Sequence, residues 1–185
     1  METVEEKRIG KYLIKIIPDT EPESPDQWDD VFGSLVYDHR QFYVSKKGFE
    51  PRDIFDHLNT GKKTYDGYWA FVVYAYIHSG VALSVGDHNF PDAQWDVSTT
   101  GFALVKREKG MYTREKALKA AKSLIETWNQ YLSGDVYGYQ ICEVDDDGEE
   151  NELDSCWGFY GQDECMKEAE SIVEYYMKKP EVQPA

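Results

Sequence analysis

Carboxylates are the residues of this chain whose number and spacing suggest chemistry most directly. Three segments concentrate them: residues 19–30, residues 143–154 and residues 163–174. Together these segments hold 19 of the 35 acidic residues and a single base, Lys167. Carboxylates at this density either bind cations, as metal ions or as lysine and arginine side chains of a partner, or form a solvated surface that keeps a protein soluble.

The charge balance of the whole chain narrows these choices. The 185 residues carry 20 lysines and arginines against 35 acids, a formal net charge of −15. Proteins that bind nucleic acid neutralise phosphates with a basic face, so this balance predicts no direct binding to nucleic acid. Solubility alone requires a net charge of only about 2 to 8, and excess like charge destabilises a compact fold. The balance therefore favours a cationic partner.

The hypothesis that follows is a binding protein rather than an enzyme. Carboxylates spaced like phosphates would occupy the basic groove of a nucleic-acid-handling protein, with electrostatic steering and strong salt dependence. The predicted partner-binding residues come from the first two acidic segments: Asp19, Glu21, Glu23, Asp26, Asp29, Asp30, Asp145, Asp146, Asp147, Glu149 and Glu150.

A metal-dependent nuclease acting on DNA or RNA is the alternative. Its Mg²⁺ ligands would come from the first acidic segment, with Glu23, Asp29 and Asp30 as weak candidates. The candidates for catalytic residues are His39, His78 and Asp96. No nucleophile elbow, phosphate-binding glycine loop or zinc-type cysteine spacing is present. We therefore expect no metal or cofactor unless this alternative holds.

Residues 143–154 also match part of a calcium-loop template. The template begins with Asp, ends with Glu and lies between helices, whereas this segment begins with Glu143, ends with Asp154 and lies between predicted strands. An acidic hairpin tip is the better interpretation. The three cysteines are an odd number and no long apolar run is present, which predicts reduced thiols, no membrane partner and a cytosolic location.

The elements that must position these carboxylates follow from the hydrophobic pattern. Apolar, β-branched runs predict about six to seven strands in an antiparallel or mixed sheet, at residues 12–17, 35–44, 68–77, 81–85, 101–105, 136–144 and 153–160. Helical spacing predicts one short helix at 51–58 and two long helices at 113–132 and 163–177. This order predicts a single α+β domain over residues 1–185.

Three parts are expected within that domain. Residues 9–45 would form an N-terminal β-hairpin with a long acidic loop, residues 46–177 an α+β body and residues 178–185 a flexible tail. The turn Asp-Asp-Asp-Gly should join the last two strands as a hairpin. A register that paired Cys142 with Cys156 would turn both thiols toward the core, and Trp157 and Phe159 would fill that core.

Several stretches resemble a widespread family of small acidic proteins from phages and mobile elements. The similarity covers most of residues 9–162, and its last two motifs are the most specific. The motifs are Pro22-Glu23-Ser24-Pro25 with Trp28-Asp29, Ile77-His78-Ser79-Gly80, Trp95-Asp96 with Gly101-Phe102, Tyr131 to Gly138, and Asp154 to Gly161. In the family an Asp commonly precedes the His-Ser-Gly motif, where this chain has Ile77.

The resemblance implies a counter-defence protein of the anti-CRISPR type. Its expected partner is a host CRISPR effector such as Cas9, or another nucleic-acid-binding defence protein, which would be inhibited through its basic groove. The departure at Ile77 argues against a catalytic or metal site that depends on the missing aspartate. Most glycines of the motifs are explained by turns or close backbone approach.

Overall fold

The structure, a computed structural model, describes residues 2–28, 33–40, 42–77, 80–86, 90, 97–108 and 113–178. The chain forms two compact units, which we call unit 1 (residues 1–23 and 134–185) and unit 2 (residues 24–133). Unit 2 is therefore an insertion within unit 1, which the chain leaves after Glu23 and re-enters at Gly134.

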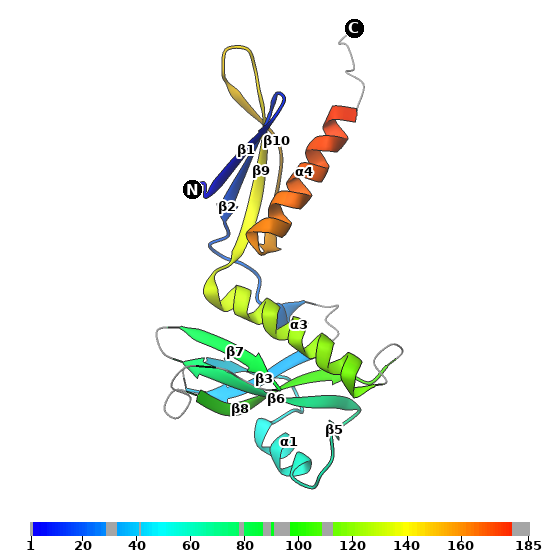
Figure 1. Cartoon of the computed structure of the whole chain (residues 1–185). Helices are drawn as coiled ribbons and strands as arrows, with labels where there is room; N and C mark the ends of the chain where they lie inside the picture. The colour runs from blue at the N-terminus through cyan, green and yellow to red at the C-terminus, as the bar shows by residue number, and fades with distance from the viewer. Residues whose placement is uncertain are drawn as a thin grey trace. The chain divides into compact units, whose positions relative to one another are not determined.

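Unit 1 is a four-stranded antiparallel sheet with one helix on one face (Figure 1). Its elements are β1 (Glu5–Ile9), β2 (Tyr12–Pro18), β9 (Val136–Val144), β10 (Glu150–Tyr160) and α4 (Gln162–Lys178), and the strand order is β1-β2-β9-β10. Ile14 and Ile16 of β2 face α4 and pack against Ala169 and Val173, all four fully buried. Alternate residues of β2 thus supply the core of this unit.

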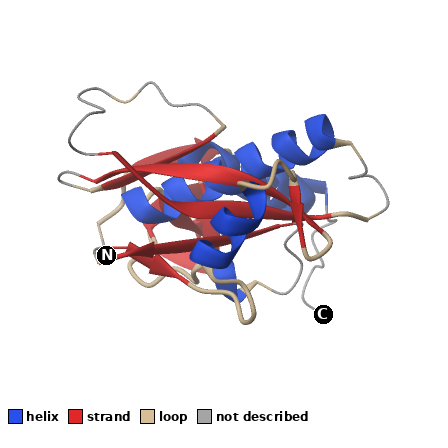
Figure 2. Cartoon of the chain, turned by 90° about the horizontal axis from the view of Figure 1, so that it is seen from below, coloured by secondary structure: helices blue, strands red, loops and turns tan. Residues whose placement is uncertain are grey.

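Unit 2 contains a second antiparallel sheet with helices on both faces. Its elements are η1 (Pro25–Gln27), β3 (Gly33–His39), β4 (Phe42–Val44), α1 (Pro51–Leu58), β5 (Thr64–Tyr65), β6 (Tyr68–Ile77), β7 (Val81–Val85), β8 (Val97–Lys106) and α3 (Arg114–Ser133). The strand order is β4-β3-β8-β6, and both β5 and β7 pair with β6. Figure 2 shows the helices in blue and the strands in red, and this combination confirms the predicted α+β class.

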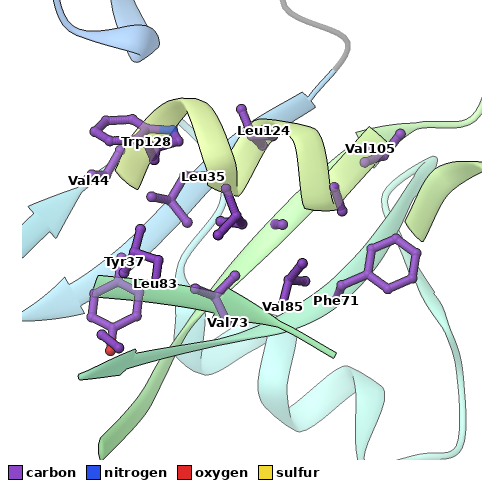
Figure 3. Packing of buried hydrophobic residues seen from close by; sticks show 14 of the residues in the cluster. Leu35, Tyr37, Val44, Phe71, Val73, Leu83, Val85, Val105, Leu124 and Trp128 are labelled. Atoms are coloured by element: carbon purple, nitrogen blue, oxygen red, sulfur yellow. The ribbon is translucent and has the colours of Figure 1, made fainter. Parts of the chain in front are cut away.

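The core of unit 2 explains why strand β6 is apolar along its whole length. On one face Val73 joins Leu35 and Val105 beneath Leu124 and Trp128 of α3 (Figure 3). On the other face β6 contributes to a separate cluster that includes residues of α1. A strand covered on both faces needs apolar side chains at consecutive positions, which is the pattern from which a central strand was predicted.

The predicted helices and the β9–β10 hairpin are confirmed, but the predicted hairpin over residues 9–45 is wrong. Strand β2 pairs with β1 and β9, whereas β3 pairs with β4 and β8 in the other sheet. The apolar side of β2 finds its partners on β9, where Ile14 lies opposite Ile141. The N-terminal strand β1 escaped prediction because four of its five residues are charged and exposed. From residue 179 on, the predicted tail lies outside the described residues.

The predicted register of β10 is also wrong. Cys142 lies opposite Glu152, and Cys156 lies opposite Tyr139, so Cys142 is buried and Cys156 is exposed. Two irregularities in β10 each add one residue relative to β9, which changes the side of the sheet that later residues face. Trp157 is 42% exposed instead of filling the core, whereas Phe159 packs against the core beside α4.

The first prediction concerns the reactivity of the three thiols. Burial raises the pKa of Cys165 to about 12 and also raises the pKa of Cys142. The reactive species is the thiolate, so native protein at pH 8 should show one thiol that reacts rapidly with Ellman's reagent, Cys156, and two that react only after unfolding. Cys156→Ser should abolish the rapid phase. Rapid reaction of two or three thiols would contradict this burial pattern.

The second prediction concerns two glycines that lie beneath aromatic rings. A Cβ atom on Gly101 would lie 1.8 Å from Cδ2 of the fully buried Tyr37, so Gly101→Ala should lower the free energy of unfolding by about 3 kcal/mol. A Cβ on Gly138 would lie 2.3 Å from Cε3 of Trp157 and 2.9 Å from the Cys156 carbonyl oxygen, but Trp157 is 42% exposed, whereas Tyr37 is fully buried. Gly138→Ala should therefore cost less than Gly101→Ala, about 1–2 kcal/mol. Urea unfolding measures both values, and a larger loss for Gly138→Ala would contradict the packing described.

Candidate functional site

The hairpin turn between β9 and β10 presents exposed carboxylates on an ordered backbone. Asp145 Oδ1 accepts hydrogen bonds from the backbone N–H groups of Asp147 (3.0 Å) and Glu149 (2.8 Å). The Asp145 N–H also donates to the Glu149 carbonyl oxygen, and Gly148 supplies the positive φ of +85°. Asp145 therefore holds the turn. We call the three exposed carboxylates that this turn presents, Asp146, Asp147 and Glu149, the acidic tip.

The lysines of unit 1 neutralise carboxylates elsewhere in the unit. Three of them come from β1, β2 and the turn between these strands, and they pair with Glu170 (2.5 Å), Glu143 (2.6 Å) and Glu150. Every described lysine of unit 1 lies in such an ion pair: Lys7, Lys11, Lys15, Lys167 and Lys178. Exposed pairs of this kind contribute only about 0–1 kcal/mol to stability, so their main effect here is on the charge pattern.

Glu150 was predicted to bind a partner, but its carboxylate accepts a hydrogen bond from Lys15 Nζ. This hydrogen bond is the main reason that the pKa of Lys15 is raised, and the lysine thus stays protonated beside its partner. In the described part of the chain, no lysine or arginine pairs with any carboxylate of the acidic tip. The acidic tip is therefore an exposed part of the 143–154 segment whose negative charge no described lysine or arginine offsets.

The first acidic segment connects the two units instead of closing a hairpin. Within unit 1, the Asp19 N–H donates to the Val136 carbonyl (2.8 Å), and the Tyr160 hydroxyl donates to the Glu23 carbonyl (2.6 Å). Asp19 Oδ1 also accepts from the Glu21 N–H at 3.1 Å. Asp26 belongs to unit 2, where its carboxylate accepts from the Ser24 hydroxyl. The predicted residues Asp29 and Asp30 lie outside the described residues.

The structure separates the two predicted groups of partner-binding residues in unit 1. Asp19 lies beside Val136, at the first residue of β9, whereas Asp145 follows Val144, at its last residue. At about 3.4 Å per residue, a strand of this length places the two groups roughly 30 Å apart. They are therefore two surfaces rather than one.

Of the catalytic and metal candidates, only His39 and Glu23 lie in the described part of the chain. His78 and Asp96 lie outside it, as do Asp29 and Asp30. His39 ends β3 in unit 2, whereas Glu23 belongs to unit 1. Across the described ranges, no group of three or more His, Cys, Asp or Glu side chains is placed to hold a metal ion. No helix in the same ranges is long and apolar enough to cross a membrane.

Unit 2 contains a small pocket that the sequence did not indicate. Its volume is about 190 Å³, below the roughly 300–1,000 Å³ of pockets that bind drug-sized ligands. Asp26, Trp28 and Lys46 contribute to its lining, and Lys46 Nζ donates to the Ser34 hydroxyl at 3.0 Å. The lining residues come from η1, β3, β4 and α3 and from their flanks, so no local pattern in the sequence identifies it.

Almost all of the net negative charge of the chain belongs to one unit. Unit 1 contains 21 acids and 7 bases, a net charge of −14, whereas unit 2 contains 14 acids and 13 bases, a net charge of −1. The net charge of −15 is thus a property of unit 1. The two units therefore differ in the charge that they offer to a binding partner.

The chain matches no protein-family model, and no curated protein or solved structure is significantly similar to it. The motif resemblance to small acidic phage proteins therefore stays a prediction. The function has to be argued from the charges and geometry of the chain itself.

The third prediction tests the role of Asp145 in the turn. Asp145→Ala removes the acceptor of two backbone N–H groups and should lower the free energy of unfolding by about 1 kcal/mol. Asp146→Ala removes an exposed carboxylate of the same turn and should change stability by less than about 0.5 kcal/mol. Urea unfolding distinguishes the two variants. Equal losses would contradict the assignment of Asp145 as the residue that holds the turn.

Proposed function

We propose that this protein is a binding protein whose acidic tip enters the cationic, nucleic-acid-binding groove of a partner. The observation that carries the proposal is the charge pattern of unit 1. Its net charge is −14 and its described lysines are all paired, yet the acidic tip is exposed and pairs with no lysine or arginine that the structure describes. A groove lined by lysine and arginine would attract these carboxylates and accelerate association.

The order of the turn also supports a binding role. A flexible acidic loop would lose conformational freedom on entering a groove, and that loss opposes binding. Here the side chain of Asp145 and the backbone hydrogen bonds of the turn hold the three carboxylates on the end of a paired hairpin before any partner arrives. A solvated surface that serves only solubility requires no such arrangement.

The proposed biological role is counter-defence in the cytoplasm of a host cell, with a CRISPR effector such as Cas9 as the target. Such effectors hold the guide–target heteroduplex in a positively charged channel, which gives an acidic mimic a site to occupy. The resemblance of the sequence motifs to acidic phage and mobile-element proteins supports this choice. Inhibition would follow from occlusion of the channel, without chemistry on the nucleic acid.

The fourth prediction tests this mechanism through the acidic tip. The variant Asp146→Lys/Asp147→Lys spares Asp145, so the turn should stay folded. The control Asp38→Lys/Asp56→Lys changes the net charge equally at exposed positions of unit 2 away from α3. In cleavage assays with a panel of guide-loaded Cas9-type effectors, we expect the acidic-tip variant to need at least about tenfold more protein for inhibition, and the control to match the native chain.

Two outcomes would overturn the proposal. The first is inhibition by the acidic-tip variant that equals the native chain and has the same salt dependence. The second is metal-dependent shortening of guide RNA when the native protein and RNA are incubated with Mg²⁺ but not with EDTA, since this would favour the nuclease alternative. Thermal melting of each variant separates a lost contact from a lost fold.

A further inference from the structure

The bases of unit 2 are arranged very differently from those of unit 1. Among the described lysines and arginines of unit 2, only Lys106 lies in an ion pair, with Glu108 at 3.4 Å. The bases also concentrate in one stretch, because residues 106–122 hold seven bases and only two acids. Although the whole chain is acidic, residues 106–122 have a net charge of +5.

Helix α3 directs three of these lysines toward solvent. Lys116, Lys119 and Lys122 are exposed, whereas Ala117 and Ala121 between them are fully buried against the sheet. At 3.6 residues per turn the three lysines fall within about 120° of the helix circumference, centred opposite the buried side. Residues three apart on a helix have Cβ atoms about 5–6 Å apart, so the three lysines form a row along the first half of α3.

Two arginines add cations beside the start of the helix, on the side that faces the sheet rather than in the lysine row. The guanidinium of Arg114 lies 5.0 Å from the ring centre of Phe71, and that of Arg107 lies 5.1 Å from the ring centre of Trp69. Both rings belong to the side of β6 that faces α3, and residues two apart on one strand lie about 7 Å apart. The two guanidinium groups are therefore neighbours, each held against an aromatic ring and each exposed.

The acids on the same part of unit 2 offset these charges only in part. Glu115 and Glu126 are exposed on the lysine-bearing side of α3, four residues from Lys119 and Lys122, and Glu108 pairs with Lys106. Five cations remain that form no ion pair with a carboxylate within the described ranges, and we call them the basic surface: Arg107, Arg114, Lys116, Lys119 and Lys122. The described lysines of unit 1 are all paired, whereas most described bases of unit 2 are not, so the basic surface is distinguished by how closely its cations lie together.

We propose that the basic surface of unit 2 binds the phosphate backbone of a nucleic acid. A row of lysines supplies point charges for successive phosphates, and guanidinium groups add forked N–H donors. The net charge of −15 predicted no such binding, but charges are screened over about 8 Å at physiological ionic strength. The local charge of unit 2 thus governs contact at its own surface. Backbone contacts of this kind are independent of sequence.

The fifth prediction measures this binding by fluorescence anisotropy of labelled 20-nucleotide RNA, single-stranded DNA and duplex DNA with the full-length chain. Five phosphate contacts on a single strand give a slope of log K against log salt of about −3.5, so affinity should fall roughly 100-fold between 50 and 200 mM salt. The variant Lys116→Glu/Lys119→Glu/Lys122→Glu should bind at least about tenfold more weakly, and its slope should be smaller in magnitude by about 2.

A matched control keeps the experiment specific to position. Lys47→Glu/Arg52→Glu/Lys62→Glu changes the net charge equally at exposed positions of unit 2 outside the basic surface, and it should bind within about threefold of the native chain. The acidic-tip variant Asp146→Lys/Asp147→Lys should still bind nucleic acid. Its slope of log K against log salt should differ from that of the native chain by no more than one phosphate contact, about 0.7. This arm separates failure of the present proposal from failure of the acidic-tip mechanism.

Three results would overturn the proposal. One is the absence of binding by the folded native chain to any of the three nucleic acids at 50 mM salt. Another is an equal loss in the matched control, which would make the effect one of net charge alone. The last is a native chain that self-associates in sedimentation and loses only this association in the lysine variant, because the basic surface would then bind the acidic tip of a second copy.

Discussion

The pairing of β2 with β9 is the interaction on which the rest of the structure depends. These strands are more than a hundred residues apart in the sequence, yet they pair from Tyr12 opposite Glu143 to Pro18 opposite Tyr137. Their apolar sides supply the centre of the unit 1 core, and their outer edges pair with β1 and β10. If this pairing were lost, unit 1 would consist of two separate hairpins and a helix without a sheet to cover.

This pairing also explains how a whole unit can be inserted between two adjacent strands. Closing a flexible loop costs entropy that grows with the logarithm of its length, so a disordered insertion of 110 residues would oppose the pairing. A folded insertion whose ends lie close together removes most of that cost. Unit 2 has its own cores on both faces of its sheet, so its folding is compatible with the closure of unit 1.

Local patterns in the sequence predicted most helices and strands but not which strands pair with one another. The helix α3 was predicted because its buried residues recur at helical spacing, and β6 because consecutive apolar residues supply both faces of a central strand. The strand β1 was missed because an exposed edge strand needs no apolar residues, and the exposure of Trp157 was missed because two irregularities in β10 shift its register. Alternation along one strand carries no information about a bulge or about which of several apolar strands is its partner.

The same limit explains the misjudged charge pattern. The 143–154 segment contains no base, but Lys11 and Lys15 reach Glu143 and Glu150 through strand pairing between residues remote in sequence. Conversely, the net charge of −15 hid the basic residues of α3, because acids elsewhere in the chain outnumber them. Only the division into units shows that one chain carries an acidic and a basic surface.

If both proposals hold, the partner should be a nucleoprotein, because its protein groove would attract the acidic tip while its exposed nucleic acid would attract the basic surface. Two linked contacts of opposite sign would then select a loaded complex over either component alone, since each contact raises the effective concentration for the other.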